Sequence, residues 1–277
     1  CEALIMNRDR TYIFARYGDY LKSVSPLKLE NAELLPEMKR YAEWNAFLPL
    51  WQARLDLEKG KAAAELSEKI AQAHPGDVMA QVWAACADYY VGHAYTAMDK
   101  HEQGLPYYKK GIAYARKALQ REPQNQPANF WYILNLSRSI QFTSLVNKGR
   151  FLMDLLRPSF LSLKENSGYS YFNIIGVCST MITNGGWVTE KGMAMAGITM
   201  DNVRNGLELA ELLYPDFFYT SYCRADLLAY KGRKKEALAM LEKLMARSPS
   251  VNPPRPENLF DQREARILYD ALKQGKR

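Results

Sequence analysis

Two stripes of apolar side chains follow one another between Pro215 and Pro249, which stand 34 residues apart. Apolar positions in both stripes recur at spacings of three and four residues, the period of one face of an α-helix. The stripes comprise Tyr222, Ala225, Leu227 and Leu228, then Ala237, Leu238, Leu241, Leu244 and Met245. Gly232 falls between them as a turn residue, and Pro249 stops the second stripe. The pattern predicts two helices joined by a short turn.

A helix–turn–helix unit of 34 residues has the period of the tetratricopeptide repeat, TPR. The small residues Ala225 and Ala237 suit positions where the two helices of one unit must approach closely. The alternative is a pair of unrelated amphipathic helices. The period, the small residues and the terminal proline together favour the repeat.

Two other stretches match the second helix of this unit. Residues 106–123 place small and apolar residues at the same offsets, and a new helix is expected from Pro127. An earlier copy covers residues 62–75, and its first helix, residues 42–60, contains Pro49, so we expect that helix to be kinked or to start late. The excess length between copies falls at residues 91–106, which we expect to be a helix extension or a loop.

These copies predict an all-α protein: a TPR-like solenoid of stacked helix–turn–helix pairs in a single domain spanning residues 1–277. Residues 248–258 are rich in proline and predict an extended stretch. The apolar stripe over residues 258–272 predicts a final helix that caps the array.

Composition narrows the class of protein. A hydrophobic content of 48% with 24% charged residues is typical of soluble globular proteins. The net charge is +7, and its densest cluster is Lys231, Arg233, Lys234 and Lys235 in the expected inter-helix turn. We interpret that cluster as a solvated surface, with weak attraction to an anionic membrane as the alternative. No basic stripe interleaves with aromatics, which disfavours nucleic acid as a partner.

Sequence motifs of enzymes and metal sites are missing. The chain has no P-loop, Rossmann fingerprint or nucleophile elbow, so we expect neither enzymatic activity nor a cofactor. The three histidines, His74, His93 and His101, have no metal-ligand spacing. Three cysteines lie in apolar helical contexts and are expected to be buried free thiols: Cys86, Cys178 and Cys223.

The first residue is Cys1, for which there are two explanations. One is an arbitrary boundary of the sequence. The other is cleavage of a lipoprotein signal peptide, which leaves a lipid-modified cysteine in first place. We favour the second, so Cys1 is the expected lipid anchor.

The stretch between residues 168 and 206 contains seven of the 16 glycines. The overlapping run of residues 166–189 has no charged residue but is rich in polar ones, so we expect a buried segment rather than a membrane span. Because glycine costs about 1 kcal/mol inside a helix, the enrichment needs a reason. One reason is close helix packing with a turn at Gly185–Gly186. The other is a lining that leaves room for an apolar ligand, with Met193 and Met195 as adaptable walls.

The stretch PYYKKGIAYARKALQREPQNQPANFWYILNLSR, residues 106–138, resembles the signature of the T component of tripartite ATP-independent periplasmic (TRAP) transporters. The matching positions are Tyr108, Gly111, Ala118, Leu119, Pro123, Phe130, Trp131, Asn135, Leu136 and Arg138. The order of later elements is also similar, ending in Pro256, Glu257 and Asn258 before an arginine-containing helix. The likeness covers roughly residues 50–274.

The resemblance implies a lipid-anchored periplasmic TPR protein that associates with the solute-binding protein of its transporter. It also implies a possible homotrimer and an apolar channel or pocket for a hydrophobic small molecule, without enzymatic activity. Six residues near the glycine-rich stretch are our candidates for lining that pocket: Trp131, Asn135, Tyr171, Phe172, Met193 and Met195.

Two alternatives remain beside this hypothesis. A generic TPR interaction scaffold of the bacterial envelope would carry polar carboxylate or amide clamps in a groove. An enzyme on a helical toroid would bring ionisable side chains together in a deep pocket. The lining of the pocket distinguishes the three: apolar, polar groove or convergent acids.

Overall fold

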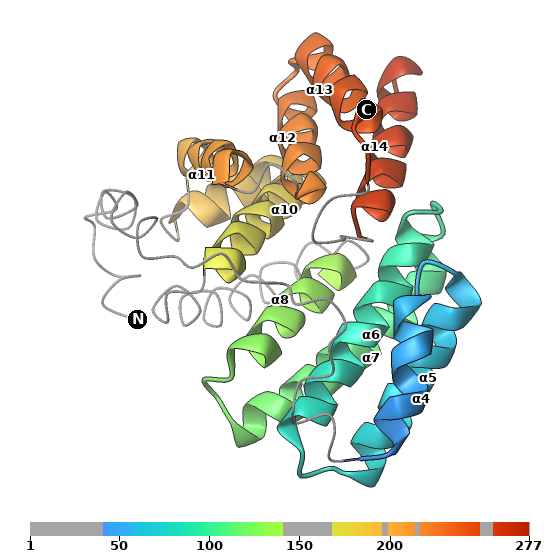
Figure 1. The fold of residues 1–277 in the computed structure, drawn as a ribbon. Coiled ribbons are helices and arrows are strands. Elements are labelled where there is room, and N and C mark those ends of the chain that lie inside the picture. The colour runs from blue at the N-terminus through green and yellow to red at the C-terminus, as the bar shows by residue number, and fades with distance from the viewer. Residues whose placement is uncertain (1–40, 141–167, 196–198, 214–216, 250–256, 277) are drawn as a thin grey trace. The chain divides into compact units, whose positions relative to one another are not determined.

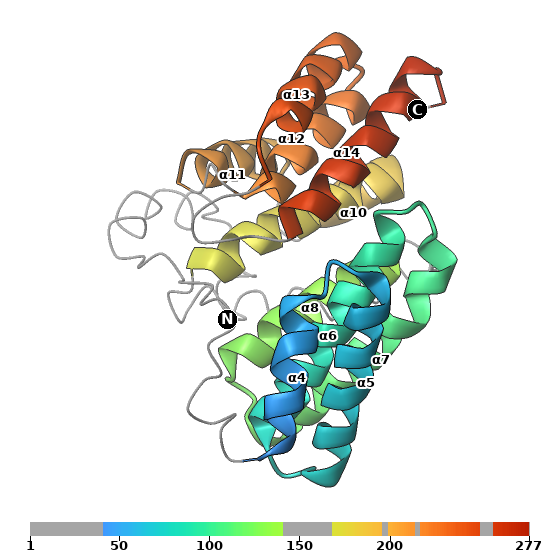
Figure 2. The ribbon, with the colours of Figure 1, turned by 45° about the vertical axis from the view of Figure 1, so that its right-hand side comes forward.

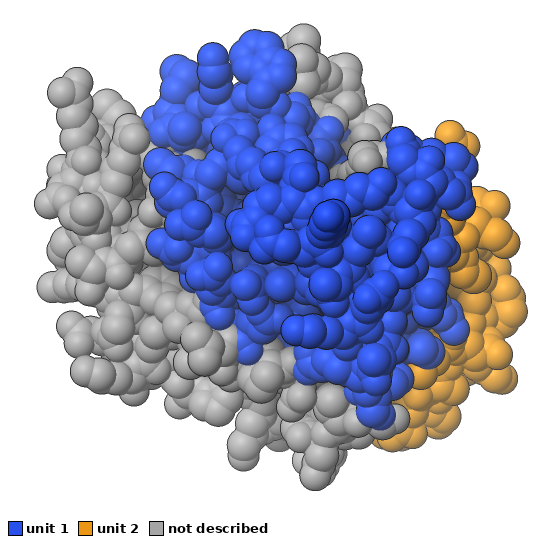
Figure 3. Space-filling view, turned by 90° about the horizontal axis from the view of Figure 1, so that it is seen from above, with its two compact units in different colours: residues 1–28, 140–277 blue, residues 29–139 orange. Residues whose placement is uncertain are grey.

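The computed structural model describes residues 41–140, 168–195, 199–213, 217–249 and 257–276. Every regular element in these ranges is an α-helix, so the predicted all-α class is confirmed (Figure 1). The described residues fall into two compact units, one within residues 29–139 and the other within residues 140–277 (Figure 3). The single domain spanning residues 1–277 stays a prediction, as does the lipid anchor at Cys1, which lies outside the described residues.

Five helices form the first unit, and the first four pack in chain order, each against the next (Figure 2). They are α4 (Glu43–Gln52), α5 (Leu57–Ala73), α6 (Val78–Thr96), α7 (His101–Arg121) and α8 (Gln126–Ile140). Buried Val82, Ala118 and Ala128 join α6, α7 and α8 in one apolar cluster. Nearly all of α6 is buried, which makes it the central helix of this unit.

Aspartate side chains set the start of two of these helices. The Asp56 carboxylate accepts hydrogen bonds from the backbone N–H groups of Glu58 and Lys59, and it caps α5. The prediction of one helix over residues 42–60 is therefore wrong. The chain forms α4, with Pro49 inside it, and then turns before a new helix begins at the Asp56 cap. Asp77 caps α6 in the same way.

The excess residues at 91–106 lengthen two helices, as one of the two expectations proposed. Helix α6 continues to Thr96 and α7 already begins at His101. Only residues 97–100 separate them, and Asp99 there adopts a left-handed backbone with φ of 58°.

The contact between α6 and α7 depends on two glycines. A Cβ on Gly104 would lie 2.8 Å from the carbonyl oxygen of Gly92, and one on Gly92 would lie 2.6 Å from the ring of Tyr108. The hydroxyl groups of Thr96 and Tyr108 are 2.9 Å apart within this contact. Absence of side chains at both glycines therefore lets the two backbones meet.

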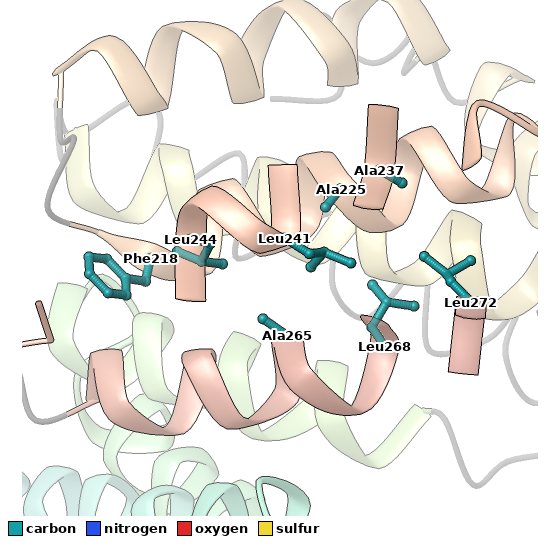
Figure 4. Close-up of a cluster of buried hydrophobic side chains, with 8 residues drawn as sticks. All are labelled: Phe218, Ala225, Ala237, Leu241, Leu244, Ala265, Leu268 and Leu272. Carbon is teal, nitrogen blue, oxygen red and sulfur yellow. The ribbon is translucent and has the colours of Figure 1, made fainter. Parts of the chain in front are cut away.

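The second unit contains the predicted helix pair. Its helices are α10 (Gly168–Met195), α11 (Met200–Leu213), α12 (Phe218–Tyr230), α13 (Lys234–Ala246) and α14 (Glu257–Lys273). Helices α12 and α13 are joined by a turn in which Gly232 has a φ of 75°, as predicted. Helix α14 packs against both. Four residues of the predicted stripes are buried between the three helices, Ala225, Ala237, Leu241 and Leu244 (Figure 4). Four more are partly buried against them: Tyr222, Leu228, Leu238 and Met245. The cluster comprises Phe218, Ala225, Ala237, Leu241, Leu244, Ala265, Leu268 and Leu272.

Helix α10 is two helices joined by a kink at Gly186, whose φ is 65°. A Cβ on Gly176 would lie 2.8 Å from the ring of Tyr219 in α12, so this glycine also serves a close approach. Both observations agree with the packing explanation for the glycine-rich stretch. Of the segment predicted to be buried, residues 166–189, residues 176–182 are buried as expected. The prediction is wrong beside the kink at Gly186, where Asn184, Trp187 and Val188 are exposed. Among the described helices, none combines the length and the apolar character needed to cross a bilayer.

We expect Gly104→Ala to destabilise the protein by about 1–3 kcal/mol, because the new methyl group would overlap the backbone of α6. Gly192→Ala is the matched control, since nothing lies within 4 Å of a Cβ at that helical position. A glycine-to-alanine change in an unconstrained helix should instead stabilise by up to about 1 kcal/mol. Urea unfolding of both variants measures the difference, and equal effects of the two changes would contradict the close backbone contact.

Candidate functional site

A groove with a volume of about 690 Å³ opens on the second unit between α11, α12 and α13. Its size falls in the range of small-molecule and peptide pockets. Apolar side chains form part of the lining: Met200, Leu207, Leu227, Leu228, Ala239, Met240 and Leu244. The remaining lining is Ser221 and ten charged residues: Asp201, Arg204, Glu208, Glu211, Arg224, Lys231, Arg233, Glu236, Lys243 and Arg247. We call this the α11–α13 groove.

Each helix contributes one face to the α11–α13 groove. The lining positions in every helix recur at spacings of three and four residues, so they form a stripe on one side of each helix. Helix α12 contributes Arg224, Leu227 and Leu228 from its middle, and α13 contributes Ala239, Met240 and Lys243. The groove therefore follows from the same helical period that builds the core.

Arginine side chains hold the carboxylates of α11 in place. Arg224 of α12 forms an ion pair with Glu211, and its guanidinium also lies 3.7 Å from a carboxylate oxygen of Glu208. The hydroxyl of Ser221 donates a hydrogen bond of 2.6 Å to the other oxygen of Glu211. These contacts join α11 to α12 along one wall of the groove.

Other charges in the lining are paired as well. Arg233 binds Glu236 through two hydrogen bonds of 2.6 Å, which lower the pKa of that carboxyl. Arg204 lies 3.2 Å from Asp201. Because Arg233 keeps the Glu236 carboxylate ionised, this group is a poor proton donor at neutral pH.

One end of the groove is positively charged. Within the described residues Lys243 forms no ion pair, and it lies one turn before Arg247 on α13. The guanidinium of Arg247 lies 4.2 Å from the ring centroid of Phe218. An acidic group entering the groove would meet these two cations.

The six candidates for ligand lining occupy different places, and none of them lines the α11–α13 groove. Asn135 is buried in the first unit, where its amide donates hydrogen bonds to the carbonyl oxygens of Ala85 and Trp131. The ring of Trp131 is half-buried in a cluster of aromatic side chains that includes Tyr89, Tyr90 and Phe130. These contacts show that Trp131 and Asn135 take part in the packing of the first unit.

In the second unit, Met193 is fully buried while Met195 is 84% exposed, so the two methionines do not share one environment. The side chains of Tyr171 and Phe172 lie outside the described residues. A ligand-binding role for the six residues stays a prediction.

The three cysteines inside helices are free and buried, which confirms the expectation for Cys86, Cys178 and Cys223. Burial raises the pKa of the Cys178 thiol to about 12. Among the described residues there is no cluster of three metal-ligating side chains. His93 is buried and lies 3.3 Å from the guanidinium of Arg138, a contact that the sequence pattern did not indicate.

A buried carboxyl group lies in the first unit. Asp88 of α6 is fully buried, and within the described part of the chain neither of its oxygens accepts a hydrogen bond. Removal from water, together with the nearby carboxylate of Glu68, raises its pKa well above the usual value. Glu68 itself is bound by Lys110 at 2.8 Å, and Tyr114 also faces this group. Asp88 is therefore held in its neutral, protonated form over a wider pH range than an exposed aspartate.

No protein-family model matches the sequence, and no characterised protein matches it significantly. The likeness to the TRAP T component therefore depends on the residues quoted for it. The α11–α13 groove was not predicted from the sequence, since each of its charged stripes, taken alone, has the pattern of a solvated helix face.

We expect Asp88→Asn to stabilise the protein at neutral pH and to reduce the loss of stability that accompanies rising pH. The folded state of the native protein keeps the Asp88 proton above the unfolded pKa of about 3.9, so its free energy of unfolding falls as pH rises through the folded pKa. An asparagine amide has the shape of the protonated group and cannot ionise. Thermal unfolding between pH 4 and pH 9 measures the effect, and parallel curves for the two proteins would contradict it.

Proposed function

We propose that this protein is a periplasmic, lipid-anchored TPR-like accessory protein that docks the solute-binding protein of a TRAP transporter. The α11–α13 groove is the proposed docking site. The resemblance of residues 106–138 and of the later elements supports the choice of partner. The helix pair α12–α13, with its 34-residue period, supports the TPR-like description.

The observation that carries the proposal is the mixed lining of the groove. Ion pairs fix charged side chains of both signs around apolar side chains from three helices. Because these charges are already positioned, a partner does not have to order them when it binds. Fixed charges give orientation and specificity, and the apolar surface supplies affinity.

A hydrophobic small molecule, which the resemblance also implies, would need another site. Ten charged residues line the groove, and enclosing an apolar ligand among them would remove water from charges that it cannot bind. A lining rich in charged residues is the one expected of the alternative function, a generic TPR interaction scaffold of the bacterial envelope. The identity of the partner decides between that scaffold and our proposal. An enzyme is not proposed.

We expect Ala239→Arg to reduce recovery of the partner at least tenfold when the full chain is purified gently from its own envelope. Ala239 is exposed and lines the groove, so the long side chain of arginine would fill the site without disturbing the core. The control is Ala246→Arg, which makes the same change at an exposed position of α13 outside the lining.

Mass spectrometry of the recovered proteins decides between the partners. A solute-binding protein that is lost with Ala239→Arg and retained with Ala246→Arg supports the proposal. Envelope-assembly proteins lost in the same pattern would replace it with the general scaffold. Equal recovery from both variants would contradict a role for the groove.

A further inference from the structure

The part of α10 that follows the kink at Gly186 exposes an apolar face. Trp187 is 66% exposed, Val188 39% and Met195 84%, whereas Thr189 and Met193 on the opposite side are buried. At 100° per residue, positions 187, 188, 191, 192 and 195 fall within an arc of about 140°. We call this arc the outer face of α10.

The outer face carries a single charged residue, Lys191, whose ammonium group lies 5.1 Å from the ring centroid of Trp187. Scattered exposed apolar residues need no explanation, but a tryptophan, a valine and a methionine on one short helix face form a patch. An exposed tryptophan beside a lysine is typical of segments that lie at the boundary between water and lipid.

A basic turn borders this face. Lys231, Arg233, Lys234 and Lys235, at the junction of α12 and α13, are all exposed. The side chain of Glu190, next to Lys191 in α10, accepts hydrogen bonds from Lys231 at 2.9 Å and from the hydroxyl of Tyr230 at 3.0 Å. These contacts fix the basic turn, residues 231–235, beside the outer face of α10.

Two lysines of the basic turn, Lys234 and Lys235, are not used in ion pairs within the described part of the chain. Lys231 binds Glu190 and Arg233 binds Glu236, but Lys234 and Lys235 form no ion pair there. Both occupy the first turn of α13, where the positive end of the helix dipole disfavours a cation. Two lysines at this helix end destabilise the fold slightly, and such a local conflict is typical of a binding site. An anionic ligand would bind both lysines and the helix end.

We propose that the outer face of α10 and the basic turn together dock on the surface of an anionic lipid bilayer. Trp187 and Met195 would enter the boundary between headgroups and acyl chains, and the lysines would bind acidic headgroups. A protein partner fits less well, because three apolar side chains fall far short of the roughly 20–30 residues that each side of a stable interface contributes. Lys231 and Arg233 of the basic turn also line the α11–α13 groove, whereas the outer face of α10 contributes nothing to that lining. The proposal does not depend on a lipid at Cys1.

The test uses the full chain with Cys1→Ser, which cannot carry an acyl chain. The protein is sedimented with vesicles of phosphatidylcholine, with and without phosphatidylglycerol. We expect binding to the vesicles that contain phosphatidylglycerol, weakening as salt is added. Lys234→Gln with Lys235→Gln should weaken binding about tenfold or more, since each lysine near an anionic surface contributes about 1 kcal/mol.

Two further variants separate the apolar contribution from general attraction by charge. Trp187→Gln with Met195→Gln should lower binding at least fivefold and abolish the vesicle-induced blue shift of tryptophan fluorescence. Lys69→Gln with Lys109→Gln is the control, because it makes the same change of net charge at exposed positions of the first unit. Far-ultraviolet circular dichroism of every variant checks that it is folded.

Three results would overturn the proposal. The first is absence of binding to vesicles that contain phosphatidylglycerol. The second is equal weakening by the control pair and by Lys234→Gln with Lys235→Gln, which would assign the binding to the net charge of +7. The third is self-association without lipid that Trp187→Gln with Met195→Gln abolishes, because the outer face would then be a contact between copies of the chain.

Discussion

The meeting of Gly92 and Gly104 fixes how closely α6 and α7 pack, and the rest of the first unit is arranged around that pair of helices. Any side chain at Gly104 would overlap the backbone of α6. The second unit uses the same device with small residues, since Gly176 of α10 admits the ring of Tyr219 and Ala225 of α12 lies in the cluster shared with α13 and α14. Where backbones come this close, the positions of neighbouring polar groups are fixed as well.

Close packing also determines the surroundings of several buried polar side chains. Asn135 meets the surface of α7 at Gly111, where any larger residue would overlap its amide, and it bonds to backbone carbonyl oxygens. Asp88 avoids a buried charge by keeping its proton. Between α10 and α12, Thr183 donates to the carboxylate of Asp226 at 2.6 Å. Polar contacts thus hold the helix pairs in register, while the apolar clusters supply most of the stabilisation.

The sequence was most informative where one helical period continued without interruption. The pair α12–α13 was predicted closely, because Pro215, Gly232 and Pro249 mark its limits and the stripe between them is regular. The break before α5 was missed, since the Asp56 cap lies inside a stretch whose apolar spacing continues past it. The α11–α13 groove was missed because it needs three helices at once, and no single stripe indicates which charged face will meet another. The different environments of Met193 and Met195 follow from a kink that composition alone does not locate.

The central functional claim is that a protein partner enters the α11–α13 groove. The most direct measurement places a photoreactive amino acid at position 239, on the lining, in the native envelope, with the same label at position 246 as the reference. We expect irradiation to join position 239, and not position 246, to a periplasmic solute-binding protein. The absence of any protein adduct at position 239, or identical adducts from both positions, would contradict the account.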